Sequence, residues 1–311
     1  MKASSGSGLW PRTRVLVAVL LMTRIADSTI RPMTETRPDP RASMTPAVLA
    51  ESRRIHDLPG LGSFRLRPAA GTTPAFQPGQ ALPVAWEEGG EVVQRWYSIA
   101  SPPEQRDALD LLVVDAKGGG RGLFSLAPGD PVWFGRPSGR FTLDRTDCRH
   151  LAFLATGTGL APYLSMLRHL RARAAAGAPV PVAVALFHGA RRSVELAFRD
   201  ELEGLAAEQP FRFVYLPCVS RPEEDPGFDP ARTAAGRAAE AAARVLGLPS
   251  PSGGERRVTF PDAFDPDALA ALLPEEDTAV YLCGNPAMID AFDAACAGTP
   301  RQERLVFERW W

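Results

Sequence analysis

The pattern of apolar residues changes near residue 148 and divides the chain into two unlike halves. Before that point, short alternating stretches are separated by Gly and Pro turns, at 63–67, 81–86, 94–99, 111–114 and 131–134. Short strands with little helical periodicity are typical of a small antiparallel barrel. We therefore expect a β-barrel domain over residues 49–147.

After residue 148, apolar runs alternate with helical patterns. The expected strands are 150–155, 182–187, 211–216 and 279–283, and the expected helices are 160–170, 194–205 and 287–295. Such alternation predicts right-handed βαβ units around a parallel sheet, here over residues 148–311. The expected fold class is thus a β barrel plus an α/β domain. The segment 222–262, rich in Pro, Ala and Gly, is expected to be a variable excursion with one helix near 233–246.

The first 48 residues do not match either pattern. They carry seven basic and three acidic residues, and the apolar run 15–22 is far shorter than the roughly 20 residues of a membrane span. We expect residues 1–48 to be a disordered or misassigned extension, with translation starting at Met33 or Met44. A secretory signal and a short ordered helix are the alternatives.

Charge and cysteine content exclude several classes of protein. The chain has 35 basic and 36 acidic residues, which argues against a globally basic nucleic-acid binder. Its four widely spaced cysteines exclude a plant-type iron–sulfur cluster in this chain and argue against a disulfide-stapled secreted module. We expect a cytoplasmic monomer that binds no metal, no nucleic acid and no membrane.

A glycine turn follows the first expected strand of the α/β half. Thr156, Gly157, Thr158 and Gly159 stand between that strand and a helix. Glycines allow the backbone to approach a diphosphate closely, and a helix N-terminus supplies amide donors. The turn lacks the full G-x-G-x-x-G spacing, so by itself it is equally compatible with an ordinary strand-to-helix connection.

A second signal is Arg95-Trp96-Tyr97-Ser98, which alone could be a surface strand with one aromatic face. It is preceded by 76–80 (Phe-Gln-Pro-Gly-Gln) and followed by 122–125 (Gly-Leu-Phe-Ser) and then the glycine turn. This ordered set resembles the ferredoxin–NADP⁺ reductase family of two-domain flavoproteins, from about residue 50 to the C-terminus.

The resemblance implies that the barrel binds FAD. Tyr97 would pack on the flavin ring, Ser98 would hydrogen-bond near N5, and Arg95 would pair with the diphosphate. These residue types suit those roles, because flat rings favour aromatic platforms and diphosphates favour the forked guanidinium. The family's G-x-x-S motif matches Gly122 and Ser125, with Leu123 between them, and implies further diphosphate contacts. Ser125 as the cap of a short helix is the alternative.

The resemblance also implies that the α/β half binds NADP(H). Thr156, Gly157, Thr158 and Gly159 match the family's nucleotide-binding turn, and Cys283 matches the cysteine beside the nicotinamide. A buried inert thiol is the alternative for Cys283.

The chain ends in Glu308, Arg309, Trp310 and Trp311. In the family, the terminus lies over the flavin or the adenine, which implies a stacking role for Trp310 or Trp311. Glu308 matches a near-terminal acidic residue implicated in proton handling or nicotinamide placement. Ser98, Cys283 and Glu308 are thus the expected catalytic residues.

Three arginines match the family positions that grip the 2′-phosphate of NADP: Arg191, Arg221 and Arg237. In a chain with 33 arginines a single match would carry little weight, but the three occur in the expected order. No acidic residue stands at Arg191 or Arg192 to accept a free 2′-hydroxyl, so NADP(H) is favoured over NAD(H). Arg237 is the weakest of the three, because its separation from Arg221 is longer than the family's.

The implied activity is that of a flavoprotein oxidoreductase. Hydride would pass between NADPH and N5 of FAD, and single electrons would pass to or from ferredoxin or flavodoxin. The alternatives are an NAD(P)H-dependent flavin or ferric-siderophore reductase, the reductase component of an oxygenase, and a non-catalytic flavin-binding module. No strong general base is needed, so His188 is expected to be a packing residue.

Overall fold

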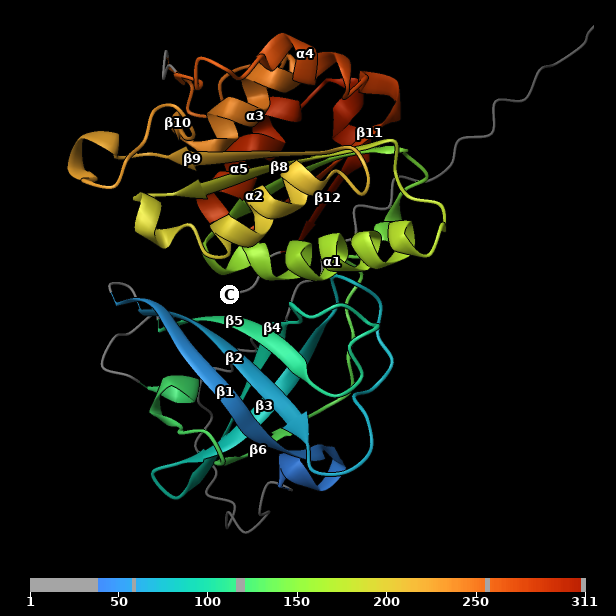
Figure 1. Cartoon of the computed structure of the whole chain (residues 1–311), viewed down its shortest axis with the longest axis vertical. Helices are drawn as coiled ribbons and strands as arrows, with labels where there is room; N and C mark the ends of the chain where they lie inside the picture. Colours follow the sequence, from blue (N-terminus) through green and yellow to red (C-terminus); the bar gives the residue numbers. More distant parts are fainter. Residues whose placement is uncertain (1–38, 58–59, 116–120, 255–257, 309–311) are drawn as a thin grey trace, which may run out of the picture. The chain divides into compact units, whose positions relative to one another are not determined.

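The computed structural model describes residues 39–57, 60–115, 121–254 and 258–308. From Asp39 onward these form one compact unit that contains two six-stranded sheets (Figure 1). The strands of the first sheet are β1 (Thr45–Asp57), β2 (Gly60–Pro68), β3 (Ala81–Glu88), β4 (Glu91–Ser98), β5 (Leu109–Asp115) and β6 (Pro131–Phe134).

The first sheet is antiparallel throughout, with the order β4-β3-β6-β1-β2-β5. A bridge between Ile99, just beyond β4, and Leu111 of β5 joins the two ends of this sheet and closes it as a barrel. Its interior is filled by apolar side chains, among them the fully buried Trp86 and Phe134. The barrel predicted from the short alternating stretches is confirmed.

Strand β1 was not anticipated, and it begins at Thr45, inside the stretch assigned to the N-terminal extension. Residues 47–50 are a continuous apolar run and residues 51–54 are exposed, so the strand shows little alternation. Tertiary pairing defines it instead, since Thr45 is opposite Phe134 of β6 and Ala47 is opposite Pro68 of β2. The division into domains stays a prediction.

The second sheet is parallel, with the order β10-β9-β8-β7-β11-β12. Its elements are β7 (His150–Thr156), α1 (Ala161–Ala175), β8 (Ala183–Ala190), α2 (Arg199–Glu208), β9 (Phe213–Val219), β10 (Ala234–Ala235), α3 (Ala238–Leu246), α4 (Pro266–Ala271), β11 (Thr278–Cys283), α5 (Pro286–Cys296) and β12 (Leu305–Glu308). The expected α/β half is confirmed.

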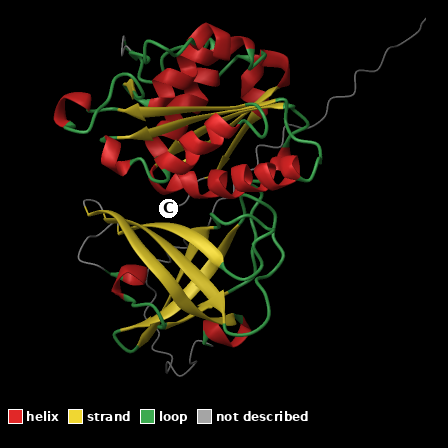
Figure 2. Ribbon diagram, in the orientation of Figure 1, coloured by secondary structure: helices red, strands yellow, loops and turns green. Residues whose placement is uncertain are grey.

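Helices cover both faces of this parallel sheet (Figure 2). Along β7, Phe153 and Ala155 face one way and pack with α1 and α2, whereas Ala152 and Leu154 face the other way and pack with α3, α4 and α5. Burial on both faces explains why the strands are continuous apolar runs rather than alternating ones.

Two expected helices begin later than the sequence suggested. The helix expected at 194–205 begins at Arg199, because Phe198 adopts a left-handed φ of 56° that interrupts helical geometry. The helix expected at 233–246 begins at Ala238, because Ala234–Ala235 pairs with β9 as strand β10.

The parallel sheet reverses its winding between β7 and β11. The chain adds β8, β9 and β10 on one side of β7 and then places β11 and β12 on the other. At such a switch point the loops leaving the two central strands diverge and open a crevice at their carboxyl ends.

Two glycines allow the ends of these strands to meet. A Cβ added to Gly159 would lie 2.2 Å from the carbonyl oxygen of Cys283, and one added to Gly284 would lie 2.2 Å from Oγ1 of Thr156. Gly284 also has a φ of +134°, which is unfavourable for residues with a side chain. The floor of the crevice can form because neither Gly159 nor Gly284 has a side chain.

We expect Gly159→Ala to destabilise the protein by about 1–3 kcal/mol, because the new methyl group would overlap backbone atoms that cannot easily move. The matched control is Gly204→Ala on α2, where an added Cβ has no atom within 4 Å and alanine favours the helix. Urea unfolding of both variants measures the difference. Equal stabilities of the two variants would contradict this account of the strand ends.

Candidate functional site

A cleft of about 940 Å³ lies at the carboxyl ends of β7, β8, β9 and β11 and is closed on its other side by strands of the barrel. It contains the switch point of the parallel sheet. Ten of the residues singled out in the sequence line it: Tyr97, Ser98, Thr156, Gly157, Thr158, Gly159, Arg191, Arg221, Arg237 and Cys283. The fold therefore brings together motifs that are spread over nearly 190 positions, while the role of each residue stays a prediction.

Other residues singled out in the sequence do not line the cleft. Within the described part of the chain these are Arg95, Gly122, Leu123, Ser125 and Glu308. Trp310 and Trp311 lie outside the described residues, so their stacking role stays a prediction.

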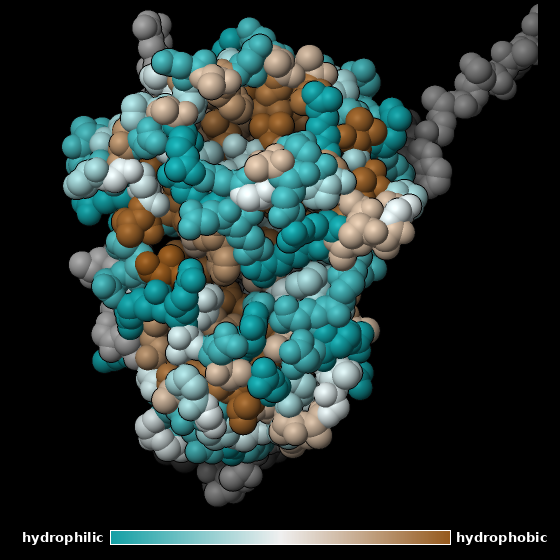
Figure 3. All heavy atoms as spheres, in the orientation of Figure 1, coloured by the Kyte–Doolittle hydropathy of each residue, from teal (hydrophilic) through white to brown (hydrophobic). Residues whose placement is uncertain are grey.

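The end of β4 supplies an aromatic wall. Burial raises the pKa of Tyr97 to about 12, so its phenol is neutral at physiological pH. Trp96 also lines the cleft and is 44% exposed, although the sequence alone assigned it no role. The face shown in Figure 3 is mostly hydrophilic. Two of the four exposed large apolar side chains among the described residues, Trp96 and Val114, belong to the cleft.

Arg95 and the turn at 122–125 belong to the barrel but lie outside the lining of the cleft. Arg95 is exposed, and its side chain makes no hydrogen bond or ion pair with another described residue. In the 3₁₀ turn η2 (Gly122–Ser125), the Ser125 hydroxyl donates to the Gly122 carbonyl at 2.7 Å, which closes the turn from its last residue. Ser125 therefore does not cap the start of a helix. Leu123 is 1% exposed and packs into the core of the barrel, so its predicted contact with the cofactor has no exposed surface behind it here and stays a prediction.

Three arginines converge on the α/β wall of the cleft. The amide of Arg221 donates to the carbonyl of Arg191 at 3.1 Å, so the loops after β8 and β9 run side by side. Arg237 is the N-cap residue of α3. All three arginines line the cleft, and their binding of a 2′-phosphate stays a prediction.

Their electrostatic states differ. Arg191 Nε lies 3.2 Å from a carboxylate oxygen of Glu195, and Arg221 Nη1 lies 3.4 Å from one of Glu224. Arg237 is exposed and forms no ion pair with a described residue. An incoming anion would compete with carboxylates at Arg191 and Arg221 but not at Arg237. Arg237 is the arginine whose assignment to the 2′-phosphate had the least support from sequence spacing.

Several cleft residues were missed from the sequence. Glu195 lines the cleft beside Arg191, and Glu240 lines it one turn beyond Arg237. The buried Glu240 carboxylate accepts hydrogen bonds from the Ser250 hydroxyl at 2.8 Å and the Ser252 amide at 3.1 Å. This fixes part of the 222–262 excursion against the cleft. Glu240 stands three residues after Arg237, and this helical spacing could have predicted that both lie on the same side of α3.

Cys283 is the last residue of β11 and pairs in register with Glu308 of β12. Burial, and to a smaller extent the Glu308 carboxylate, raises the pKa of the Cys283 thiol well above its usual value. The thiol therefore stays protonated at physiological pH, which suits a contact residue and not a nucleophile.

His188 of β8 is 1% exposed, and its Nδ1 lies 3.0 Å from the Tyr215 hydroxyl. Burial, with a smaller contribution from the positive charge of Arg199, lowers the pKa of His188 to about 3. The imidazole is neutral under ordinary conditions and packs inside the sheet, in agreement with the role expected from the sequence.

Comparison with known proteins gives consistent matches. The family described as an oxidoreductase NAD-binding domain matches residues 153–294. Ferredoxin–NADP reductase B of Sorangium cellulosum is 40% identical over 134 residues, which are 42% of this chain and 52% of that protein. The reductase component of a phenol 2-monooxygenase from Pseudomonas sp. is 30% identical over 237 residues, 75% of this chain and 56% of that protein.

A solved structure shows the same fold. The ferredoxin NADP⁺ reductase of Neisseria gonorrhoeae, crystallised with FAD and NADP, superposes with a TM-score of 0.63 at 23% identity, over 86% of this chain and 98% of that one. The chain spans about half the length of the curated relatives it matches. Within its described residues, no helix is long and apolar enough to cross a membrane.

We expect His188 to make folding stability pH-dependent. Its pKa is about 3 when folded and about 6.5 when unfolded, so only the unfolded state gains this proton between those values. Stability should therefore fall as pH decreases below 6.5, by about 2 kcal/mol at pH 5 from this group. Urea unfolding at pH 7 and pH 5 should show a smaller loss for His188→Gln than for the wild type. Identical losses would contradict the neutral buried state.

Proposed function

We propose that the chain is a member of the ferredoxin–NADP⁺ reductase family and acts as an FAD-dependent oxidoreductase. It would move hydride between NADPH and flavin N5 and exchange single electrons with ferredoxin or flavodoxin. The observation that carries this proposal is the cleft at the switch point. The cleft is lined by Tyr97 and Ser98 at the end of β4, by the glycine turn, by the protonated thiol of Cys283 and by three arginines. The similarity to a ferredoxin–NADP reductase supports the choice of electron partner.

The residues at the barrel side fit FAD. Arg95 offers an exposed guanidinium with no counterion among the described residues, which suits a diphosphate. Tyr97 offers a neutral aromatic side chain, and the Ser98 hydroxyl can donate or accept a hydrogen bond. FAD, when bound, takes up a hydride as an electron pair and releases the electrons one at a time.

The residues at the α/β side fit NADPH. The turn η4 (Gly157–Leu160) leads into α1 and offers backbone amides and the positive end of a helix dipole to a diphosphate. Arg191, Arg221 and Arg237 would hold the 2′-phosphate. Cys283 would bound the nicotinamide pocket as an uncharged thiol, and Glu308 would lie behind it in β12.

A second candidate is the reductase component of an oxygenase. The similarity to the phenol 2-monooxygenase reductase component extends over 75% of this chain, more than the similarity to the Sorangium reductase. The chemistry inside the cleft would be the same, and only the protein that receives the electrons would differ.

Steady-state assays with NADPH and a panel of acceptors distinguish these functions. We expect ferredoxin or flavodoxin to be reduced faster than free flavin or ferric chelates. Turnover limited to ferric chelates would contradict the proposed partner but leave the hydride transfer intact. Purified protein that does not retain FAD would contradict every flavoprotein function, and FAD-loaded protein that NADPH cannot reduce would favour a non-catalytic flavin-binding module.

We expect Arg237→Ala to weaken NADPH binding about 10-fold and to leave NADH binding within about 2-fold, because a charge-assisted hydrogen bond contributes roughly 1.5 kcal/mol. Arg221→Ala should act in the same direction but less, since Glu224 already neutralises part of its charge. The control is Arg244→Ala, also on α3, where the arginine pairs with Asp267. Equal losses for NADPH and NADH in fluorescence titrations would contradict the 2′-phosphate assignment.

A further inference from the structure

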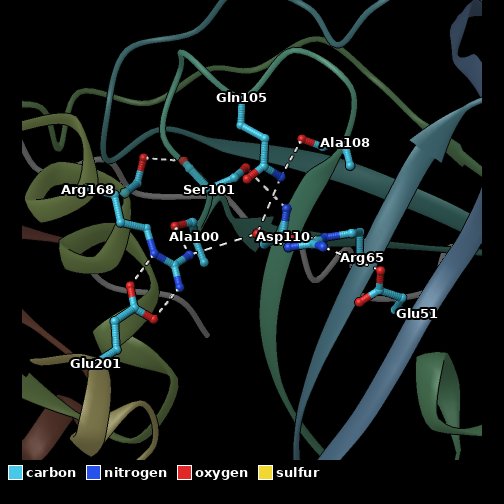
Figure 4. Close-up of polar contacts among 10 residues, drawn as sticks. Glu51, Arg65, Ala100, Ser101, Gln105, Ala108, Asp110, Arg168 and Glu201 are labelled. Carbon is cyan, nitrogen blue, oxygen red and sulfur yellow. Dashed lines mark hydrogen bonds and ion pairs between the residues drawn. The ribbon is translucent and has the colours of Figure 1, made fainter. Parts of the chain in front are cut away.

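Several side chains of helix α1 contact the barrel half of the chain, among them His169, whose Nδ1 lies 2.6 Å from a carboxylate oxygen of Glu104. Two others, Ser165 and Arg168, lie one turn apart and donate to backbone carbonyls of the barrel; Figure 4 labels Arg168. The Ser165 hydroxyl donates to the Ser101 carbonyl at 2.7 Å, and Arg168 Nη1 donates to the Ala100 carbonyl at 2.9 Å. Ala100 lies two residues beyond Ser98, at the end of β4. The helix that follows the glycine turn is thus bonded directly to the strand end that carries Tyr97 and Ser98.

The guanidinium of Arg168 is oriented by contacts within the α/β half, in addition to its bond to the barrel. Its Nε and Nη2 donate to the two carboxylate oxygens of Glu201 at 2.6 and 2.7 Å, a forked pair that fixes the plane of the group. Its Cζ lies 5.3 Å from the centre of the Phe198 ring. The side chain is 21% exposed, so water screens these contacts only in part.

The residues of the barrel that accept these bonds, Ala100 and Ser101, are themselves hydrogen-bonded to Asp110. The amide of Ala100 donates to the Asp110 carbonyl at 2.8 Å, and the amide of Asp110 donates to the Ser101 hydroxyl at 3.1 Å. The Asp110 carboxylate in turn accepts from Arg65 Nε at 2.7 Å. Figure 4 shows this as one continuous network from Glu201 on α2 to Arg65 on β2.

We propose that the Arg168–Glu201 pair is a positioning device for hydride transfer, which sets the separation between Ser98 on the barrel and the glycine turn before α1. The inference rests on the proposed function. Hydride transfer needs the reacting atoms in contact, and a misplacement of about 1 Å can slow such a step about 100-fold. Binding of either nucleotide uses residues of one wall of the cleft and should depend less on this contact.

The test compares Arg168→Met with Arg171→Met. Arg171 is also on α1 and pairs with Glu208 of α2 at 2.8 Å, but it has no hydrogen bond to the barrel among the described residues. Single-turnover reduction of the FAD-loaded protein by saturating NADPH should be at least about 10-fold slower in Arg168→Met and unchanged in Arg171→Met. The long-wavelength absorbance from stacked nicotinamide and flavin should weaken in parallel, whereas the NADPH dissociation constant should change by less than about 2-fold.

Arg168→Lys keeps the test decisive if Arg168→Met does not fold. Lysine retains the charge but lacks the fork, so it cannot bind both Glu201 oxygens and Ala100 together. We expect a wild-type melting temperature with several-fold slower hydride transfer.

Three results would count against the inference. A normal rate and normal absorbance with only a lower melting temperature would reduce Arg168 to a structural contact. A loss of NADPH affinity equal to the loss of rate would assign it to binding. A wild-type protein that NADPH cannot reduce would contradict the proposed function itself, whereas a normal rate in Arg168→Met beside an active wild type overturns the positioning role alone.

Discussion

The site depends on how closely the ends of β7 and β11 approach each other. Gly159 and Gly284 remove the side chains that would separate the glycine turn from Cys283 and the end of β11 from Thr156. This approach occurs where the parallel sheet reverses its winding, so the two loops diverge immediately beyond it. A crevice with backbone amides along its floor is the direct consequence, and the cleft residues are arranged around it.

The groups within the cleft are matched to a reaction that needs orientation more than acid–base strength. Burial keeps the Cys283 thiol protonated and the phenol of Tyr97 neutral. Permanent charge is concentrated in arginines on the α/β wall, two of which are balanced by Glu195 and Glu224. Such an arrangement can recognise an anionic nucleotide while the reacting centre stays uncharged, and the contact of Arg168 with the barrel holds the two walls at a fixed separation.

The sequence predicted those features that local patterns determine. The change from alternating to continuous apolar runs indicated both sheets. Motif order selected Arg191, Arg221 and Arg237, which line the same cleft, while their role stays a prediction. It missed β1, whose residues show little alternation and whose pairing with β6 is long-range, and the interruption at Phe198, whose left-handed backbone is unusual for an aromatic residue. Side-chain contacts could not be predicted from the sequence either. Neither the ion pairs of Arg191 and Arg221 nor the hydrogen bond from Arg168 to Ala100 follows from residue spacing, because each depends on how separate elements pack.

The central claim is that one cleft holds flavin and NADPH for direct hydride transfer. Anaerobic mixing of the FAD-loaded protein with NADPH deuterated at the transferred position tests it most directly. The account predicts loss of the oxidised-flavin absorbance in a single fast phase, slowed by deuterium, and a much slower reaction with NADH at the same subsaturating concentration. Flavin that stays oxidised, or reduction with no isotope effect and no preference between NADPH and NADH, would contradict it.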